Sequence, residues 1–597
     1  MKNILIAIRS IFKKGRHNVM KIVSLGIGLA VGLVLIAKVY FEQSYDDFYP
    51  DRDRVYQVWA KYQQNGGELK DYPQTSGGIA PTMQQQIPEI ETVTRYTSFG
   101  DWTFTMTDTK MKYSGRCIIA DSCFFDILPR PMLIGNAKEV LSTPMYVLVS
   151  SRIAKNIGGD VIGKNFTVDS SPGRTMTIGG VFEEVPENSH SRYDVIVSMA
   201  SAGRFMWEGS PTNMLGNDRY ISYVKLHKGV NPLALEEQVH TFVNSYFPPE
   251  EQQKTGFNIG FSFHELDGLH KELPQVKRMT WILSLLAFAL IFTAVMNYIL
   301  IVISSIVNRS KEVAVHKCYG ASENNIHGMM FGEALVHIVL SLILALLLIL
   351  AFRGTVEELL ATSLDSLLLS NGSLVLLGIC ILVFFVSGFM PGSLYARIPV
   401  ASAFRNYREN KRIWKKALLL VQFVATGFLV TMLVFVARQY TFMVNDRPGY
   451  AYENLAYCGL AGVDSTSRAK ILDEVMRLPG VVAATTVYQL PFEHASGNNI
   501  LLPGETQELF NIADLYWVGN GYLDMMEIPV IQGRSFTENV TNSREVMVDR
   551  RFVEKMKLVA GWTDDVIGKD ICVTEHSKWN EEPFTICGVY ELSLIHI

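Results

Sequence analysis

The chain has 597 residues, of which 48% are hydrophobic, with a formal net charge of −4 and a mean hydropathy of +0.16. A chain of this length holds several domains, and it is too apolar on average for an ordinary soluble enzyme. A nucleic-acid partner would require a basic surface, so the charge argues against one.

The apolar residues concentrate in runs of about twenty that carry almost no charge, the length that a helix needs to cross a bilayer. The sequence therefore predicts an α-helical membrane protein with five transmembrane helices and two α+β extracytoplasmic domains. The transmembrane helices are expected at 22–41, 279–307, 329–352, 367–396 and 417–437. In the first, Lys38 can extend its ammonium to the membrane interface. A cleaved signal peptide is the alternative for this segment, but no cleavage site with small residues follows it.

The short loops set the orientation. Residues 1–21 carry six Lys or Arg and no acid, and residues 397–416 carry seven with one Glu, so both are expected in the cytoplasm. The same alternation makes 308–328 cytoplasmic and 353–366 an outer loop. The two outer domains are then 42–278 and 438–591.

The pentapeptide DVIGK occurs at 160–164 and again at 565–569, an offset of 405 (569 minus 164). Three further blocks match in the same order: IPE at 87–89 with LPG at 478–480, FFDIL at 124–128 with YLDMM at 522–526, and TIGGVFE at 177–183 with TICGVYE at 585–591. Their offsets are 391, 398 and 408. Loop insertions in a duplicated domain increase the offset along the chain in this way. We therefore predict an internal repeat.

In the first outer domain, alternating stretches such as VYQVWAKY at 55–62, YVLVS at 146–150 and YISYVKL at 220–226 predict half-buried strands. A helix is predicted after Asn231, a good N-cap, with Pro232 in its first turn. Its apolar stripe, which predicts a core face, is Leu235, Val239, Phe242, Val243 and Tyr246.

Residues 158–165, GGDVIGKN, come within one residue of a phosphate-binding loop. Asn165 lacks the hydroxyl that would hold magnesium, and the following residues resemble a strand rather than a helix N-terminus. The second copy has Thr563 where the first loop glycine should stand. Gly163 and Gly568 are instead predicted to turn the chain between an amphipathic helix and a strand.

No catalytic residue, metal site or cofactor of its own is predicted for the chain. The outer histidines lack ligand spacing, and neither G-x-S-x-G nor H-E-x-x-H occurs. Five of the seven cysteines, whose redox state the sequence does not determine, are expected outside: Cys117, Cys123, Cys458, Cys572 and Cys587. Cys572 and Cys587 can bridge neighbouring strands, but Thr167 and Gly179 stand at their equivalents, which argues against an architectural bridge.

The segment 308–326, NRSKEVAVHKCYGASENNI, predicts a helix of about three turns that leaves the membrane. Gly320 is expected as its left-handed C-cap and Ser322 as the N-cap of the next helix. Such an element would lie at the membrane surface with its charges toward the cytoplasm or a partner protein. A solvated loop is the alternative.

KEVAVHKCYGAS at 311–322 resembles the K-E-I-G-x-R-K-x-x-G-A-S signature of FtsX-like permease domains, with Asn297, Phe331 and Glu333 around it. His316 stands where the signature has arginine. SYDDFYPDRDRVYQV at 44–58 is similar to the opening of the MacB-like periplasmic core domain of double-length permeases. The resemblance covers essentially the whole chain.

This resemblance implies a non-catalytic membrane subunit of a type VII ABC transporter, which works by mechanotransmission in the bacterial inner membrane. ATP would be bound by a separate ATPase subunit. The segment contacting that ATPase would comprise Lys311, Glu312, His316, Lys317, Gly320, Ala321 and Ser322. A dimer or pseudo-dimer and a periplasmic adaptor or outer-membrane channel are further implied partners. The alternatives are a membrane regulator of cell-wall enzymes and a membrane-anchored receptor or enzyme without an ATPase.

Two smaller features complete the predictions. Ser24, Gly28 and Gly32 form a row of small residues that permits close helix contact, within the bundle or at a dimer seam.

The hexapeptide LSLIHI at 592–597 is what a transposase end sequence used in the preparation of sequencing libraries encodes. We therefore expect an adapter-derived tail and a natural chain that continues into further helices.

Overall fold

The structure is a computed structural model. It describes residues 17–64, 69–169, 171–216, 218–255, 257–369, 372–396, 400, 413–445, 449–460, 463–490, 498–505, 508–512, 515–536, 544–563, 565–574 and 582–591. The basic segments expected at 1–21 and 397–416 fall largely outside these residues, and the tail at 592–597 falls wholly outside them. The chain divides into two compact units, 1–168 with 173–431 and 169–172 with 432–597.

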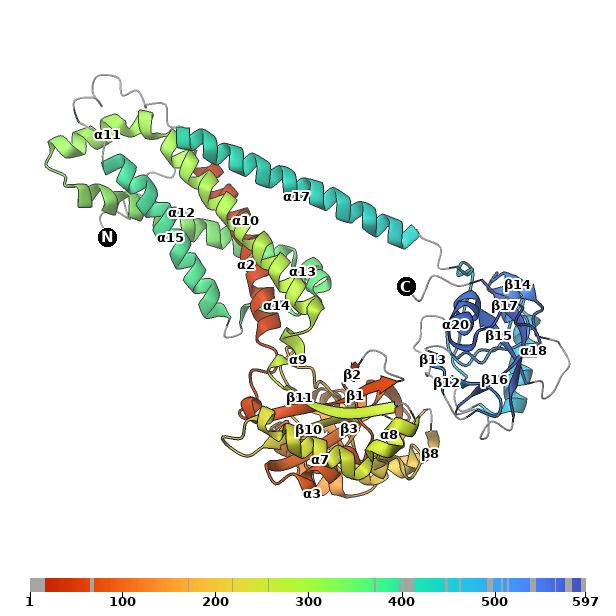
Figure 1. Cartoon of the computed structure of the whole chain (residues 1–597). Helices are drawn as coiled ribbons and strands as arrows, with labels where there is room; N and C mark the ends of the chain where they lie inside the picture. The colour runs from red at the N-terminus through yellow and green to blue at the C-terminus, as the bar shows by residue number, and fades with distance from the viewer. Residues whose placement is uncertain are drawn as a thin grey trace. The chain divides into compact units, whose positions relative to one another are not determined.

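Five described helices are long and apolar enough to cross a membrane: α2 (Asn18–Gln43), α10 (Pro274–Ser304), α12 (Glu323–Ala351), α15 (Ser373–Ala396) and α17 (Ile413–Asn445). Helices α2, α10, α12 and α15 pack side by side as a bundle (Figure 1). Its core includes Leu25, Leu29, Tyr298 and Ile299, all at most 2% exposed.

Some helix boundaries differ from the predicted ones. The apolar run at 279–307 contains a break, because α10 ends at Ser304 and a separate helix, α11 (Ile306–Cys318), begins directly after it. The expected outer loop 353–366 is largely helical, with α13 (Arg353–Leu360) and α14 (Leu364–Leu368). Because α14 takes the start of the fourth apolar run, α15 begins at Ser373 rather than at 367. Hydropathy locates apolar runs and not the turns within them.

The first outer domain is built on one sheet of eleven strands. Its strands are β1 (Val55–Gln64), β2 (Lys70–Tyr72), β3 (Ile90–Met106), β4 (Lys112–Ala120), β5 (Met132–Ile134), β6 (Tyr146–Ser150), β7 (Asn165–Val168), β8 (Ser171–Phe182), β9 (Val195–Ser198), β10 (Ile221–Leu226) and β11 (Phe257–Glu265). The order is β11-β1-β10-β3-β4-β9-β6-β8-β5, with β2 on β1 and β7 on β3 and β8. Strand β6 runs parallel to β8 and β4 parallel to β9, while the other pairs are antiparallel.

Short helices accompany the sheet: η1 (Arg52–Arg54), α3 (Ile79–Gln86), α4 (Phe124–Ile127), α5 (Ala137–Ser142), α6 (Ser151–Ile157), η2 (Met199–Arg204), η3 (Ser210–Thr212), η4 (Pro232–Leu235), α7 (Glu236–Tyr246), α8 (Pro249–Thr255) and α9 (Gly268–Lys271). They enclose three apolar clusters, two of which lie around β6 and β9 and one around β1 and α7. Since β6 and β9 contribute to clusters on both faces, their side chains are almost all buried. The half-buried strands predicted from alternation are therefore wrong for β6.

The helix predicted after Asn231 is present as η4 followed by α7, and the Asn231 side chain caps it by accepting from Leu233 N at 3.1 Å. Leu235, Val239, Phe242 and Val243 are buried as predicted, whereas Tyr246 is 39% exposed. Tyr246 uses its hydroxyl to accept from Gln86 Nε2 at 3.1 Å, so it lies at the rim of the core.

The second unit has its own smaller sheet in the order β13-β12-β16-β17-β14, with β15 parallel to β17. Its described elements are α18 (Ser465–Met476), β12 (Asn498–Leu501), β13 (Phe510–Ile512), α19 (Tyr522–Met525), β14 (Val530–Gly533), β15 (Glu545–Asp549), α20 (Arg550–Ala560), β16 (Asp570–Val573) and β17 (Phe584–Tyr590). Val553 and Met556 of α20 pack on Val548 and Ile586 in one apolar core. The described residues of the second unit thus combine a sheet with helices.

Candidate functional site

The sequence-predicted site residues lie on α11 and the turn that joins it to α12. Helix α11 ends at Cys318, and Gly320 has φ +84°, which favours glycine. The amides of Tyr319, Gly320 and Ala321 donate to carbonyls of the last turn of α11 at 3.0 to 3.1 Å. The Ser322 side chain then caps α12 by accepting from Asn325 N at 3.4 Å. The predicted C-cap and N-cap are both confirmed.

Helix α11 has one buried and one exposed face. Val313 and Ala314 are 1% exposed and belong to the core of the helix bundle. Lys311 and His316 are exposed, and Tyr319, in the turn, is 88% exposed. An exposed face with a lysine, a histidine and an aromatic side chain can contact a protein partner.

Lys317 corrects the expectation that all charges of this segment face outward. Its Nζ donates to the carbonyl oxygen of Ala396 at 2.6 Å, at the end of α15. This carbonyl belongs to the last turn of a helix, where carbonyl groups have no partner within the helix. Lys317 therefore attaches α11 to α15, and both Lys317 and Glu312 are only partly exposed.

The small-residue row of α2 faces α10. A Cβ on Gly28 would lie 2.3 Å from Cβ of Ala294, and one on Gly32 would lie 2.4 Å from Cγ1 of Ile291. Ser24 is partly buried. The sequence reasoning missed Gly26, where a Cβ would lie 2.9 Å from Leu344 Cδ2, so α2 approaches α12 closely as well.

A buried ion pair joins α2 to α12. Lys21 Nζ lies 3.6 Å from Glu333 Oε1, and the two side chains are 0% and 8% exposed. Lys21 also donates to Asn18 Oδ1 at 3.2 Å. Charges inside an apolar bundle are costly unless paired, so this pair holds α2 and α12 in one register. The sequence reasoning counted Lys21 only as a basic residue near the N-terminus, although a charge beside an apolar run is a usable signal.

At its other end, α2 joins the first outer domain through paired charges. Lys38 Nζ contacts Glu42 Oε1 at 2.7 Å and Thr362 Oγ1 at 2.8 Å, and Glu42 Oε2 lies 2.5 Å from His270 Nε2. The ring of His270 stacks on Tyr45 with centroids 3.6 Å apart. Lys38 is 7% exposed, so the expectation that it extends to the membrane interface is wrong: its charge is neutralised internally.

A second histidine continues this junction. His190 Nδ1 lies 2.6 Å from Asp46 Oδ2, and its Nε2 lies 2.5 Å from the Tyr223 hydroxyl on β10. Beside the junction is a cavity of about 570 Å³, lined by cations and acids that include Arg116, Arg192 and Glu187. The end of α2 is therefore attached to the sheet by buried polar contacts, which can transmit a movement of the helix.

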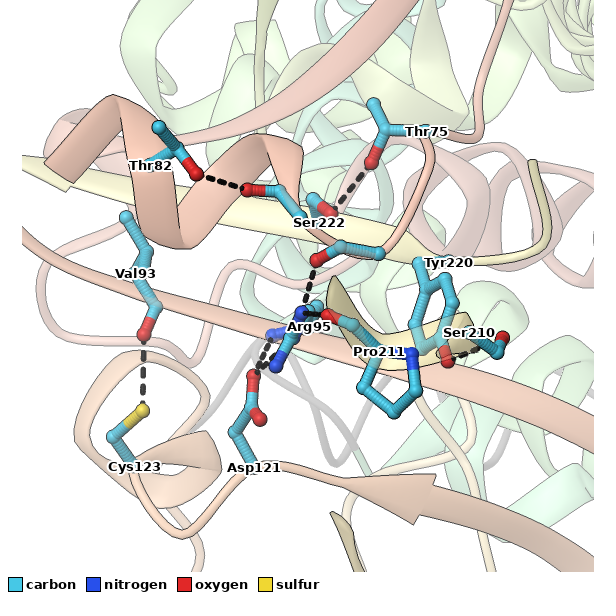
Figure 2. Close-up of polar contacts among 12 residues, drawn as sticks. Thr75, Thr82, Val93, Arg95, Asp121, Cys123, Ser210, Pro211, Tyr220 and Ser222 are labelled. Atoms are coloured by element: carbon cyan, nitrogen blue, oxygen red, sulfur yellow. Dashed lines mark hydrogen bonds and ion pairs between the residues drawn. The ribbon is translucent and has the colours of Figure 1, made fainter. Parts of the chain in front are cut away.

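A partly buried cation, Arg95, holds the middle of the outer domain together (Figure 2). Arg95 on β3 donates to the carbonyl oxygens of Gly77 and Pro211, and its Nε donates to Asp121 Oδ2 at 3.2 Å. Burial raises the pKa of Asp121, while Arg95 acts in the opposite direction. These contacts tie two loops to the sheet.

The structure brings no group of three or more His, Cys, Asp or Glu side chains together as a metal site within the described ranges. No disulfide joins any of the seven cysteines, all of which lie in the described part of the chain. Cys572 and Cys587 lie on neighbouring strands but are not opposite each other, since Asp570 pairs with Thr585 and Ile571 with Phe584.

These features define the chain as a membrane protein with a helix bundle, an exposed turn element at one end and a large α+β outer domain at the other. Comparison with protein families gives the same class. Residues 20–242 match the MacB-like periplasmic core domain, and residues 284–400 match the FtsX-like permease C-terminal domain. The chain belongs to the family of MacB/FtsX-like ABC transporter permeases.

Several solved structures are similar to part of the chain. A domain of a putative permease protein from Porphyromonas gingivalis is 32% identical over 36% of this chain and 91% of its own, with a TM-score of 0.34. The periplasmic region of MacB from Actinobacillus actinomycetemcomitans is 16% identical over 37% and 92%, with a TM-score of 0.24. The extracellular domain of the ABC-type transporter YknZ from Gram-positive bacteria is 10% identical over 35% and 98%, with a TM-score of 0.26. No curated protein matches the chain.

Proposed function

We propose that this chain is the permease subunit of an ABC-type transporter, in which a separate ATPase drives the outer domains through the helix bundle for efflux or export. The coupling segment would comprise Lys311, Glu312, His316, Lys317, Gly320, Ala321 and Ser322. Residues 1–21, 308–328 and 397–416 would face the cytoplasm, and 42–278 and 438–591 would lie outside. The chain itself would be non-catalytic, with ATP bound by its partner.

The observation that carries this proposal is the attachment of α11 on its inner side. Val313 and Ala314 lie in the bundle core, and Lys317 is hydrogen-bonded to Ala396, so a force on the exposed face of α11 moves α15 with it. The Lys21–Glu333 pair links α12 to α2, and the Glu42–His270 contact links α2 to the outer domain. These contacts, together with the bundle core, connect the exposed turn with the outer domain.

The two outer regions would be copies of one unit, each following a transmembrane helix. This proposal rests on the sequence blocks that match between them and on the main-chain hydrogen bonds that those blocks make. A pair of such units is compatible with a pseudo-dimeric permease.

The two exposed cysteines can test the orientation of the chain in the membrane without engineered cysteines. Cys318 lies at the end of α11 and Cys458 in the second unit, and both are exposed. In intact cells, a membrane-impermeant maleimide should label Cys458 and leave Cys318 unlabelled until the cells are opened. Labelling of Cys318 in intact cells would contradict the proposed topology.

The same residues test the ATPase contact. A benzophenone attached to Cys318 should cross-link an ABC ATPase in membranes of the source organism, whereas the same group on Cys458 should not. Replacing Lys311 with Glu and Glu312 with Lys should reduce this cross-link at least tenfold, because each charge is replaced by its opposite while the net charge stays the same. Lys164→Glu, in the first outer domain, is the matched control. Recovery of no ATPase would favour the receptor or enzyme alternative.

Efflux and regulation differ in the molecule that the complex would bind or move: a cargo in the first case and a cell-wall enzyme in the second. Cargo recovered with the detergent-solubilised complex, or ATP-dependent loss of a substrate from cells, would support export. A complex that carries no cargo and binds a cell-wall hydrolase would support the regulator alternative instead.

A further inference from the structure

The cavity of about 570 Å³ beside the end of α2 contains two arginines that pair with no described residue. Lys38, Phe41 and Tyr45 line it on the side of the membrane helix. Arg116 of β4 and Arg192 of the loop before β9 line it from the outer domain. Both arginines are exposed, so a ligand in the cavity can reach their guanidinium groups. Neither group forms an ion pair or a hydrogen bond with a residue that the structure describes.

Both guanidinium groups act on the same side chain. Tyr45 follows α2 directly, and its ring stacks on His270 with centroids 3.6 Å apart. Burial raises the pKa of Tyr45, while the charges of Arg192 and Arg116 act in the opposite direction. Because such an effect weakens with distance, the two arginines lie in one region of the cavity. A ligand that contacts one of them is therefore close to the other.

Two of the three carboxylates in the lining are already paired with cations. Glu42 Oε1 lies 2.7 Å from Lys38 Nζ, and Glu357 Oε1 lies 2.9 Å from Arg353 Nε. These pairs compensate their charges within the protein. The third carboxylate belongs to Glu187.

Glu187 has an oxygen that no described group uses. Its Oε2 accepts from the amide of Ser363 at 3.0 Å, and its Oε1 accepts from no described residue. The side chain is partly exposed and forms no ion pair within the described part of the chain. The uncompensated charges of the lining are thus two cations, Arg116 and Arg192, and one anion. A ligand that complements them carries a negative group and a separate cationic donor.

The cavity lies at the end of an apolar helix. Lys38 and Phe41 belong to the last turns of α2, and Thr362 belongs to the turn between α13 and α14. Leu359 and Leu369, on either side of that turn in the sequence, are 77% and 81% exposed. A charged cavity near exposed apolar side chains, at the end of a transmembrane helix, suits a lipid with a charged headgroup.

We propose that this cavity binds the headgroup of a lipid that carries a phosphate and a primary ammonium, as phosphatidylethanolamine does. The phosphate oxygens would accept hydrogen bonds from Arg116 and Arg192, and the ammonium would donate to Glu187. Arginine suits the first contact because its planar donors match phosphate oxygens, and a primary ammonium supplies three N–H donors for the second. The site does not depend on the proposed coupling to an ATPase.

The test measures lipid binding to the full chain in detergent by native mass spectrometry. Three lipids with the same acyl chains are compared: phosphatidylethanolamine, phosphatidylcholine, whose methyl groups replace the N–H donors, and phosphatidylglycerol, which has no ammonium. We expect the first phosphatidylethanolamine to bind at least tenfold more tightly than either of the others. Equal binding of the three lipids would overturn the proposal. Tighter binding of phosphatidylglycerol would also overturn it, because the ammonium would then contribute nothing.

Substitutions test the two contacts separately. Arg116→Gln combined with Arg192→Gln should weaken the binding of phosphatidylethanolamine at least tenfold. Glu187→Gln keeps an acceptor for the Ser363 amide and loses the charge, so it should remove the preference over phosphatidylglycerol without weakening the binding of phosphatidylglycerol. An unchanged preference in either variant contradicts the proposed contacts. Arg204→Gln is the matched control, because Arg204 is an exposed arginine of the same domain outside the lining, and it should change binding less than twofold.

A variant that fills the cavity decides the question if the arginine variant does not fold. Ala361 lines the cavity and is exposed, so Ala361→Trp should occupy the space while all the charges remain. We expect this variant to lose the preference for phosphatidylethanolamine over phosphatidylcholine. Retention of the full preference would show that the lipid binds elsewhere and would overturn the proposal.

Soluble phosphoethanolamine distinguishes a lipid from a free headgroup. It offers the same two charged groups without acyl chains, so it should compete with phosphatidylethanolamine only at a concentration at least a hundredfold higher. Competition at equal concentration would overturn the assignment to a lipid and identify a soluble amino phosphate as the ligand.

Discussion

The two DVIGK regions have the same main-chain arrangement with different side chains. Gly163 and Gly568 have φ +78° and +81°, and each amide donates to an isoleucine carbonyl, that of Ile178 or Ile586, at 2.8 Å. Those isoleucines donate in return to Lys164 and Lys569 at 3.0 and 2.9 Å. The pentapeptide thus forms a turn, after which the next strand lies beside TIGG or TICG. In this turn, each lysine contributes its main-chain carbonyl as a hydrogen-bond acceptor.

The strand pairing is shared as well. Strand β6 runs parallel to β8 with a register shift between Val147 and Leu148, and β15 runs parallel to β17 with a shift between Val546 and Met547. Both shifts fall at one position of the alignment, since 546 minus 147 and 547 minus 148 are each 399. An irregularity repeated at an equivalent position belongs to the architecture. The comparison therefore separates the positions that the shared main chain needs from positions such as Arg130, where the second region has Ile528.

The largest expected effect comes from the glycines that meet a facing carbonyl. Gly135 and Gly533 have φ +84° and +75°, and an added Cβ would lie 2.7 Å from Gly179 O and 2.4 Å from Cys587 O. Alanine combines left-handed strain with an overlap against main chain, so we expect a loss of about 3 kcal/mol in either region. Pulsed maleimide labelling in urea measures it.

Two buried cysteines report on the two regions separately, since Cys117 and Cys572 are both 0% exposed. Gly135→Ala should hasten labelling of Cys117 alone, and Gly533→Ala that of Cys572 alone. An effect in one copy and none in the other would break the equivalence.

A smaller effect is expected at the glycines of DVIGK. Nothing lies within 4 Å of a Cβ built on Gly163 or Gly568, so alanine there meets only the strain of a left-handed backbone. We expect a loss of about 1 to 2 kcal/mol in each region. Gly173→Ala is the control, because it also has open space but no positive φ. Equal losses at Gly163 and Gly135 would show that the facing carbonyl contributes nothing.

Helix caps distinguish the copies further. Ser150 caps α6 by accepting from Ile153 N at 3.3 Å, and Asp549 caps α20 by accepting from Phe552 N at 2.7 Å. Alanine at either position should cost about 1 kcal/mol, measured by the same cysteine labelling. Exchanging the residues, Ser150→Asp and Asp549→Ser, should be tolerated at the partly exposed Asp549 and not at Ser150, which is 0% exposed. Tolerance at both would show that burial does not decide the choice.

Local chemistry was sufficient to predict many elements from the sequence. Twenty-residue apolar runs predicted the five helices, and Gly320 and Ser322 predicted the turn before α12. The Gly163 and Gly568 turns were likewise predicted, because a glycine before a strand has few other uses. Each of these predictions depends on residues within one turn or one helix.

Features that depend on distant partners could not be predicted. Lys21 and Glu333 are 312 residues apart (333 minus 21), and Lys317 finds a carbonyl at Ala396 only because α11 packs on α15. Arg130 looks like any loop arginine until Phe124, Phe182 and Tyr193 enclose it. Packing creates these sites, and a single sequence does not show which distant residues pack together.

The smallest prediction uses acid to separate the two regions. Asp121 stands in the first region where the 398 offset places Gly519 in the second, so only the first has this titrating carboxyl. Burial raises the pKa of Asp121 in the folded state, and the folded protein then binds the proton more tightly than the unfolded chain does. The stability that this proton supplies is fully present below the unfolded pKa of 3.8 and is lost as the pH rises through the folded pKa.

The wild-type chain should therefore gain stability relative to Asp121→Asn as the pH falls from 7 toward 4. Hydrogen exchange of β3 and β4, corrected for the intrinsic pH dependence, measures the difference, with β16 and β17 as the internal reference. A relative gain by Asp121→Asn in acid would show that the ion pair with Arg95 outweighs burial.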